Sequence, residues 1–361
     1  MSIDQKLTAI RDTIQQDVGN RGLARDPADN LITACPDDFA NACASVADHK
    51  QPRIAVVTGF FIPTAEPPAF ETDGPLGALM LARALGSLGI GVILQSEPEL
   101  NQALAAGLRA CGVEQGPEIA RLPPFPHAHK FTVRADKLRR ADTPRSITPQ
   151  FRAIYRGLCE RDGQPVSHRI ALERVGPNYT LDKLREWPTA SSADVAAFVA
   201  SVPEHRRDRC FTMRGRDVTE AMSPAHLLFE SDGPDPGSCV TIGIGDGGNE
   251  IGMGKIAWDT ICRNIPNGEL VACRVATDHL IVAGVSNWGA YALAAGVALL
   301  RGVELPAELF DAERERAILQ KMVEAGPLVD GVTGRQTATV DGLSWDDYIR
   351  PLVEIGKIVR A

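Results

Sequence analysis

A glycine-rich loop holds the densest group of chemically useful residues in the sequence. Residues 239–255 read CVTIGIGDGGNEIGMGK, and the pattern predicts a strand at 239–244 and a helix at 249–264. Three glycines match the G-x-G-x-x-G fingerprint of dinucleotide-binding proteins: Gly243, Gly245 and Gly248. The fingerprint alone is weak evidence, because a nucleotide phosphate also needs a loop free of negative charge.

Two carboxylates in this loop favour a cation over a phosphate. Asp246 lies inside the loop, and Glu250 falls in the first turn of the predicted helix, where a pyrophosphate would bind. With Asn249 they offer oxygen atoms, which suit Mg²⁺, Mn²⁺ or a substrate ammonium group. These three are therefore the candidate catalytic residues. The alternative is an ordinary glycine-rich turn in which Glu250 only starts the helix.

A second acidic turn follows the strand predicted at 53–58. It reads ETDGPLGA at 71–78 and leads into a helix predicted over 74–88. Asp73 has an alternative explanation as the residue that caps this helix. Glu71 has no such structural explanation, so it is the stronger candidate for chemistry.

These acidic turns are expected to meet. Loops at the carboxyl ends of parallel strands share one edge of the sheet, and ligands bind at that edge. Asp278, after a strand predicted at 270–276, would join them there, although it can equally be a turn residue. The predicted ligands of a divalent metal are Glu71, Asp73, Asp246, Glu250 and Asp278.

Weaker candidates come from residues that can bind a carboxylate. Ser286 and Asn287 open a predicted helix over 288–302, where they can cap it or, with free N–H groups, hold an anion. Arg174 and Arg214 stand at predicted strand ends and can make bidentate carboxylate contacts. Either arginine can equally form a structural ion pair.

Two segments interrupt the regular pattern. Residues 121–150 are rich in proline and are expected to form a flap or linker, and His127 and His129 within them are an outside candidate for a metal pair. Residues 177–210 are polar and are expected to be a surface insertion that can act as a lid. We expect one domain over 1–361 that contains both segments.

The remaining pattern alternates strands and helices, which is typical of an α/β fold with a mainly parallel or mixed sheet flanked by helices. Strands are predicted at 53–58, 91–94, 168–173, 239–244, 270–276 and 279–284. Helices are predicted at 3–20, 74–88, 98–111, 249–264, 288–302 and 345–358, with a hairpin at 329–343.

Composition excludes several protein classes. Lys and Arg number 38 against 46 Asp and Glu, a net charge of −8, which argues against a nucleic-acid partner. None of the 8 cysteines forms C-x-x-C, which disfavours zinc ribbons and thioredoxin-type sites. The apolar stretch 280–300 is interrupted by Ser286, Asn287 and several glycines, so no membrane span is expected. The N-terminus lacks an apolar signal region. We expect a soluble cytoplasmic protein, with a homo-oligomer possible.

Several longer motifs resemble one family, the D-glutamate cyclase-like proteins. They are TGFFIP at 58–63, ETDGPLGA at 71–78, LERVG at 172–176, TMRG at 212–215, IGDGGNEIGMGK at 244–255 and AGVSNWGAYAL at 283–293. Asp17 and the run NRGL at 20–23 also resemble the family, and the resemblance spans residues 15–355. One feature departs from it: the acidic D-G step that follows E-R-x-G in the family is replaced here by the 177–210 segment.

The resemblance implies a carbon-oxygen lyase that closes D-glutamate to 5-oxo-D-proline with loss of water. On this reading Glu250 or Asp246 takes a proton from the ammonium group, and a divalent metal, Mg or Mn, polarises the γ-carboxyl group. Arg174 or Arg214 would bind the α-carboxylate, and backbone N–H groups at 247–249 or near Ser286 would hold the oxyanion. Three alternatives stay open: a metal-dependent hydrolase or phosphatase, a non-catalytic binder of small amino acids and, last, a nucleotide-binding oxidoreductase.

Overall fold

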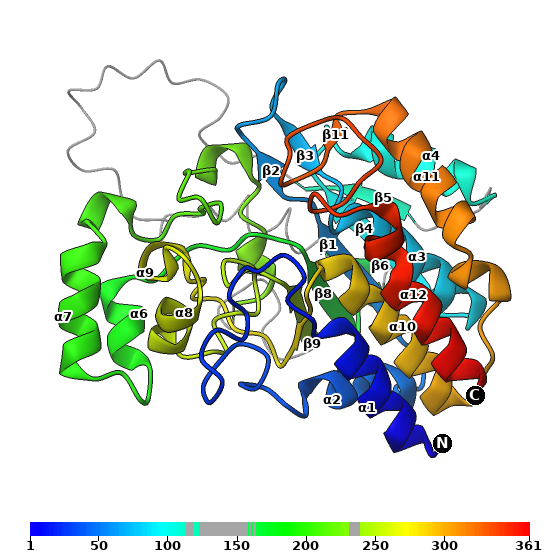
Figure 1. Ribbon diagram of the computed structural model, residues 1–361, viewed down its shortest axis with the longest axis horizontal. Coiled ribbons are helices and arrows are strands. Elements are labelled where there is room, and N and C mark those ends of the chain that lie inside the picture. The colour runs from blue at the N-terminus through cyan, green and yellow to red at the C-terminus, as the bar shows by residue number, and fades with distance from the viewer. Residues whose placement is uncertain (113–117, 123–157, 159, 162–163, 231–238) are drawn as a thin grey trace.

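The computed structural model describes most of the chain, drawn in colour in Figure 1. The described residues are 1–112, 118–122, 158, 160–161, 164–230 and 239–361. Most of the proline-rich segment predicted at 121–150, including the His127 and His129 pair, lies outside them.

A six-stranded sheet forms the centre of the molecule, and all of its strand pairs are parallel. The strand order is β10-β9-β8-β1-β4-β5. The strands are β1 (Arg53–Thr58), β4 (Gly91–Ser96), β5 (Glu118–Arg121), β8 (His168–Leu172), β9 (Val240–Gly245) and β10 (His279–Val282). The chain builds outward from β1 on one side and then returns to build outward from β8 on the other. The order therefore reverses between β1 and β8, and ligands of such sheets bind at that reversal.

The two faces of the sheet are covered by different parts of the chain. Along β1, Val56 belongs to one buried hydrophobic cluster and Val57 to another, as expected when successive side chains point to opposite faces. The first cluster takes in the long helices α1 (Ile3–Ile14), α3 (Pro75–Ser87), α10 (Ser286–Arg301) and α12 (Trp345–Arg360). The second takes in α6 (Leu181–Glu186), α7 (Ser192–Ser201), α8 (Trp258–Asn264) and α9 (Gly268–Val271), which gather on the left of Figure 1. Both faces are thus buried, which explains the nearly continuous apolar strands.

The helices and the minor strands have the following bounds. The helices are α1 (Ile3–Ile14), α2 (Asp38–Asp48), α3 (Pro75–Ser87), α4 (Asn101–Ala110), α6 (Leu181–Glu186), α7 (Ser192–Ser201), α8 (Trp258–Asn264), α9 (Gly268–Val271), α10 (Ser286–Arg301), α11 (Ala312–Ala325) and α12 (Trp345–Arg360). A small sheet joins β2 (Phe61–Ile62), β3 (Ala69–Glu71) and β11 (Leu328–Val329), and β6 (Glu160–Arg161) pairs with β7 (Gln164–Pro165). Every helix among the described residues is too short or too polar to cross a bilayer.

The α/β prediction is confirmed, and four local predictions are wrong. The helix predicted at 3–20 ends at Ile14. Residues 249–256 form turns and isolated bridges, and the helix starts only at Trp258, because glycines at positive φ break the helical path. The strand predicted at 270–276 is replaced by the end of α9 and single bridges. The hairpin predicted at 329–343 is a closed loop after β11.

The segment at 177–210 is an ordered part of the second face. It contains α6 and α7, and the Phe198 side chain is buried against Trp258 of α8. Single bridges tie Pro177 to Cys210 and Asn178 to Cys273. The segment therefore packs as a helical pair against α8 and α9.

Candidate active site

Six carboxyl groups gather at the edge of the sheet where the strand order reverses. They are Glu71, Asp73, Glu173, Asp246, Glu250 and Asp341, and all six residues are buried. Two overlapping groups of three bring ligand oxygens within 4.8 Å of one another: Asp73, Asp246 and Asp341, and Glu173, Asp246 and Glu250. The predicted meeting of the two acidic turns is thus observed.

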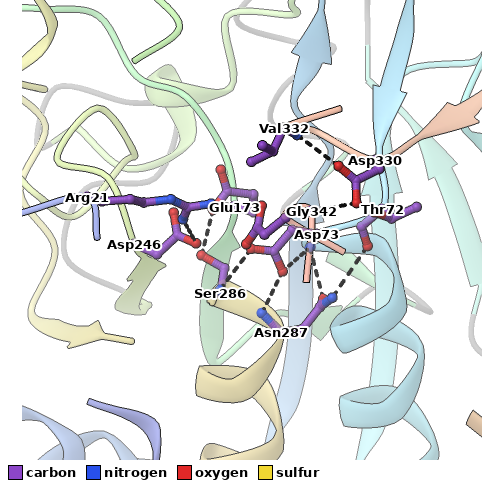
Figure 2. Close-up of polar contacts among 12 residues, drawn as sticks. Arg21, Thr72, Asp73, Glu173, Asp246, Ser286, Asn287, Asp330, Val332 and Gly342 are labelled. Carbon is purple, nitrogen blue, oxygen red and sulfur yellow. Dashed lines mark hydrogen bonds and ion pairs between the residues drawn. The ribbon is translucent and has the colours of Figure 1, made fainter. Parts of the chain in front are cut away.

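Asp73 and Asn287 hold two helix ends together by capping each other's helix. The Asp73 carboxylate accepts hydrogen bonds from the backbone N–H of Ser286 at 2.9 Å and of Asn287 at 2.8 Å, at the start of α10. In return, the Asn287 Oδ1 accepts the N–H of Gly74 at 2.9 Å and of Gly77 at 2.7 Å, at the start of α3. Figure 2 shows this exchange. Asp73 therefore caps the start of α10, and Asn287 caps the start of α3.

Glu173 enters the cluster directly from the end of β8. Its carboxylate accepts a 2.5 Å hydrogen bond from the Ser286 hydroxyl (Figure 2). Its backbone has φ of 45°, a left-handed conformation that is uncommon for a residue with a side chain. Gly74 lies against it, and a Cβ on Gly74 would stand 2.8 Å from the Glu173 Cβ. The turn after β3 therefore requires glycine at this position.

Glu250 shapes the glycine loop that carries Asp246. One Glu250 oxygen accepts the Gly248 N–H at 2.8 Å, and the other accepts the Asp246 N–H at 3.3 Å. Asn249 donates its Nδ2 to the Phe211 carbonyl at 2.8 Å, while its buried Oδ1 has no hydrogen-bond partner. A buried acceptor without a donor is costly in a native protein, so Asn249 Oδ1 points to a ligand that donates.

Arg21 brings the one guanidinium that forms an ion pair with this cluster in the described part of the chain. It pairs with Asp246 and, at 2.7 Å, with Asp341. The Asp17 carboxylate accepts the N–H groups of Arg21, Gly22 and Leu23 at 2.8, 2.8 and 3.0 Å, which fixes the loop that presents the side chain. The NRGL motif therefore completes a site built mainly from residues far along the chain.

Asp341 reaches the cluster on a loop that Asp330 holds closed. The Asp330 carboxylate accepts the N–H groups of Val332, Thr333 and Gly342 at 3.1, 2.8 and 2.8 Å, and also the Thr339 hydroxyl at 2.7 Å. Figure 2 shows Asp330 above the cluster. The buried Asp330 thus fixes the loop and the position of Asp341.

Burial and mutual repulsion change the protonation of these groups. Burial, reinforced by neighbouring carboxylates, raises the pKa of Glu71, Asp73 and Glu173 well above the ordinary values. Burial also raises the pKa of Glu250. It raises the pKa of Asp246 to about 6 and that of Asp341 to about 7, although Arg21 opposes the rise in both. At neutral pH the cluster therefore combines protonated and ionised carboxyl groups.

The donor set fits a hard divalent cation by chemistry, because every available ligand atom is an oxygen. The two groups of three differ in how many of their carboxylates pair with Arg21. Asp246 and Asp341 of the first group already bind Arg21. The second group, Glu173, Asp246 and Glu250, shares Asp246 with that ion pair.

The other predicted site residues lie in different places. Arg174 is fully buried in a bidentate ion pair with Glu97, at 2.7 and 2.5 Å, so its guanidinium is committed to a structural partner. Arg214 is exposed and donates to the Val332 carbonyl at 3.2 Å, on the loop that carries Asp341. Asp278 is not brought to the cluster: it binds Thr241 near the amino end of β9, at the opposite edge of the sheet. The physical reason is that the strand expected before Asp278 does not form.

Ser286 and Asn287 are at the site, but their polar groups have protein partners. Their backbone N–H groups go to Asp73, and their side chains go to Glu173 and to the start of α3. They are therefore not free to hold a carboxylate in this arrangement. The Gly248 N–H, expected to face an oxyanion, goes to Glu250.

Three central residues were not among the predicted site residues: Arg21, Glu173 and Asp341. Arg21 lies in NRGL and Glu173 precedes Arg174 in LERVG, so both residues could have been predicted from the motifs that resemble the family. Asp341 had no such signal, because its place depends on the closed loop after β11.

Comparison with known proteins agrees with the motifs. The family model for D-glutamate cyclase-like proteins, C-terminal, matches residues 10–355. The chain is also 28% identical over 303 residues to the mitochondrial D-glutamate cyclase of Homo sapiens. That match covers 83% of this chain and 40% of the human protein, so the chain spans well under half the length of its relative.

Proposed function

The chain belongs to the D-glutamate cyclase-like family, and from this membership we propose that it converts D-glutamate to 5-oxo-D-proline and water as a carbon-oxygen lyase. The observation that carries the proposal is the buried carboxyl cluster at the strand-order reversal, with Asn249 Oδ1 left without a donor. A substrate ammonium group supplies donor hydrogens for Asn249 Oδ1, and it adds positive charge to a cluster in which Arg21 pairs with only two of the six carboxyl groups.

Ring closure requires that the ammonium group lose a proton before the nitrogen attacks the γ-carboxyl carbon. We assign this proton to Asp246, with Asn249 Oδ1 accepting a second N–H and so orienting the nitrogen. The pKa of Asp246, raised to about 6 chiefly by burial, suits a general base near neutral pH. Glu250 is the less suitable base, since both of its oxygens already accept backbone N–H groups. Its role is to shape the loop.

The leaving oxygen must depart as water, which requires protons. Glu71 and Glu173 are the candidate donors, because burial raises the pKa of both well above the ordinary range and favours the protonated form. Overall, the nitrogen loses two protons, the departing oxygen gains two, a C–N bond forms and a C–O bond breaks. The reaction therefore balances with no other reactant.

The substrate carboxylates need cationic partners. Arg214, which is exposed beside Val332, is available for the α-carboxylate, whereas Arg174 is bound to Glu97. The divalent ion that the sequence predicted would be held by Glu173, Asp246 and Glu250 and would supply polarisation of the γ-carboxyl group, but the proposed reaction does not require it. Because Asp246 is also the partner of Arg21, the two cations compete for one carboxylate.

The test is to incubate the purified protein with D-glutamate and, separately, with a panel of phosphate esters, and to follow both by NMR. The proposal predicts 5-oxoproline from D-glutamate and no release of phosphate. Phosphate release would favour a metal-dependent phosphatase on the same carboxylates. Calorimetric binding of D-glutamate without turnover would favour a non-catalytic binder.

A further inference from the structure

We propose that Arg21 is the resident cation of the carboxyl cluster, and that a divalent metal ion binds the cluster only when Arg21 is removed. The inference deepens the function proposed above, on which its consequence for turnover rests. Its statement about metal binding is independent of any reaction.

The first support is the position of the guanidinium. Arg21 pairs with Asp246, which is the residue common to both metal-capable groups, and with Asp341, which belongs to one of them. The side chains are largely enclosed, with 17%, 5% and 4% exposed for Arg21, Asp246 and Asp341. Figure 2 shows Arg21 entering from the side, with its guanidinium at Asp246. A metal ion on Asp246 would therefore face a neighbouring positive charge at close range.

The second support is that the backbone around Arg21 is fixed. Asp17 holds three successive N–H groups of the loop, and Leu23 is completely buried just beyond it. Gly22 has φ of 98°, and a Cβ there would stand 2.2 Å from the Asn264 carbonyl oxygen. The loop thus presents Arg21 from one defined position, so the guanidinium is a built part of the site.

The third support is the charge of the site. Within the described residues, every other ion pair that the structure shows lies outside the six carboxyl groups. A guanidinium remains charged at all physiological pH values, and its planar donors match two carboxylates at once. Arg21 therefore supplies the permanent positive charge that a metal ion would otherwise bring.

This arrangement has a consequence for turnover. Arg21 favours the ionised form of Asp246, the proposed base, and links the glycine loop to the loop of Asp341. Arg21 is thus a positioning residue that acts through Asp246. If the proposed function holds, turnover in the unmodified protein does not depend on added metal and persists in EDTA.

The experiment measures Mn²⁺ binding to the purified full chain by calorimetry and by loss of the free Mn²⁺ signal in electron paramagnetic resonance. The unmodified protein is expected to show no site up to about 1 mM Mn²⁺, and Arg21→Ala is expected to gain one that is at least about tenfold tighter. Arg21→Lys, which keeps the charge, is expected not to bind. The matched control is Arg263→Ala, because Arg263 pairs with Asp29 and Asp259, neither of which belongs to the cluster, and its loss should leave Mn²⁺ binding unchanged.

Equal Mn²⁺ binding by the unmodified protein and Arg21→Ala would overturn the inference, and so would binding by neither. If Arg21→Ala does not fold, as judged by circular dichroism, Arg21→Gln takes its place. A separate arm follows 5-oxoproline formation: Arg21→Ala is expected to lose at least about 100-fold in kcat and to recover part of it with added guanidinium ion. No product from any variant, with the predicted Mn²⁺ pattern, would contradict the proposed reaction but not the role of Arg21.

Discussion

Replacing Asn287 with alanine tests the reciprocal capping that holds the site together. The change removes the Oδ1 that accepts the Gly74 and Gly77 N–H groups, and the Nδ2 that donates to the Tyr348 hydroxyl at 3.1 Å. Asn287 is fully buried, so water cannot easily replace these bonds. The backbone N–H of residue 287 keeps its bond to Asp73.

The cost can be worked out bond by bond. The Gly77 N–H loses its acceptor in a buried place, which costs about 2 kcal/mol. The Gly74 N–H loses its bond to Asn287 but keeps a 3.0 Å bond to Asp73. The loss of the Gly74–Asn287 bond and of the bond to the Tyr348 hydroxyl together costs about 1 kcal/mol. The total is about 3 kcal/mol. With an unfolding entropy of about 0.8 kcal/mol/K for 361 residues, Tm should fall by about 4 °C.

Thermal and urea unfolding of Asn287→Ala measure this loss, and Ser344→Ala is the control. Ser344 caps α12 at the surface: its hydroxyl accepts the Asp347 N–H at 3.2 Å and donates to the exposed Asp347 carboxylate at 2.7 Å, so its loss should cost only about 1 kcal/mol. If Asn287→Ala costs no more than Ser344→Ala, the capping of α3 by Asn287 does not contribute as argued.

Three further predictions follow from the buried titratable groups. Turnover of D-glutamate should fall as pH drops below about 6, where Asp246 gains its proton, and a pH–rate profile that is flat from pH 5 to 8 would contradict Asp246 as base. Glu71→Gln should raise the unfolding free energy by about 1 kcal/mol or more, because ionising this buried carboxyl group opposes folding. The gain should be larger at pH 8 than at pH 5, and urea titrations at both pH values check it. Burial lowers the pKa of His168 to about 4, so about 3 kcal/mol of stability should be lost as pH falls from 6.5 to 4, and His168→Gln should flatten that loss in the same titration.

The sequence predicted five of the six strands of the main sheet, because these are short, apolar and separated by glycine or by helices, and it missed the half-exposed edge strand β5. The strand at 53–58 and the helices near α3, α10 and α12 were found within a few residues. The sequence also predicted which acidic turns meet, since that follows from the shared edge of a parallel sheet. Asp73, Asp246 and Glu250 meet for this reason.

The errors have local physical causes. Glu250 was expected at a helix start, yet positive φ values of 91° at Gly248 and 110° at Gly252 prevent a helix there. Asp73 was predicted as a metal ligand, with capping of its own helix as the alternative. It caps α10 instead, which only the tertiary arrangement determines. Arg174 was predicted to bind substrate, but its guanidinium is held by Glu97, and its neighbour Glu173 enters the cluster instead.

Proton NMR of D- and L-glutamate with the purified chain tests the central claim most directly, with Asp246→Asn run beside the unmodified protein. We expect 5-oxoproline from the D-isomer alone, and a rate lower by about 10²–10⁴-fold in Asp246→Asn, because general-base catalysis contributes a factor of that size. Absence of 5-oxoproline from D-glutamate with the unmodified protein, or full activity in Asp246→Asn, would contradict the account.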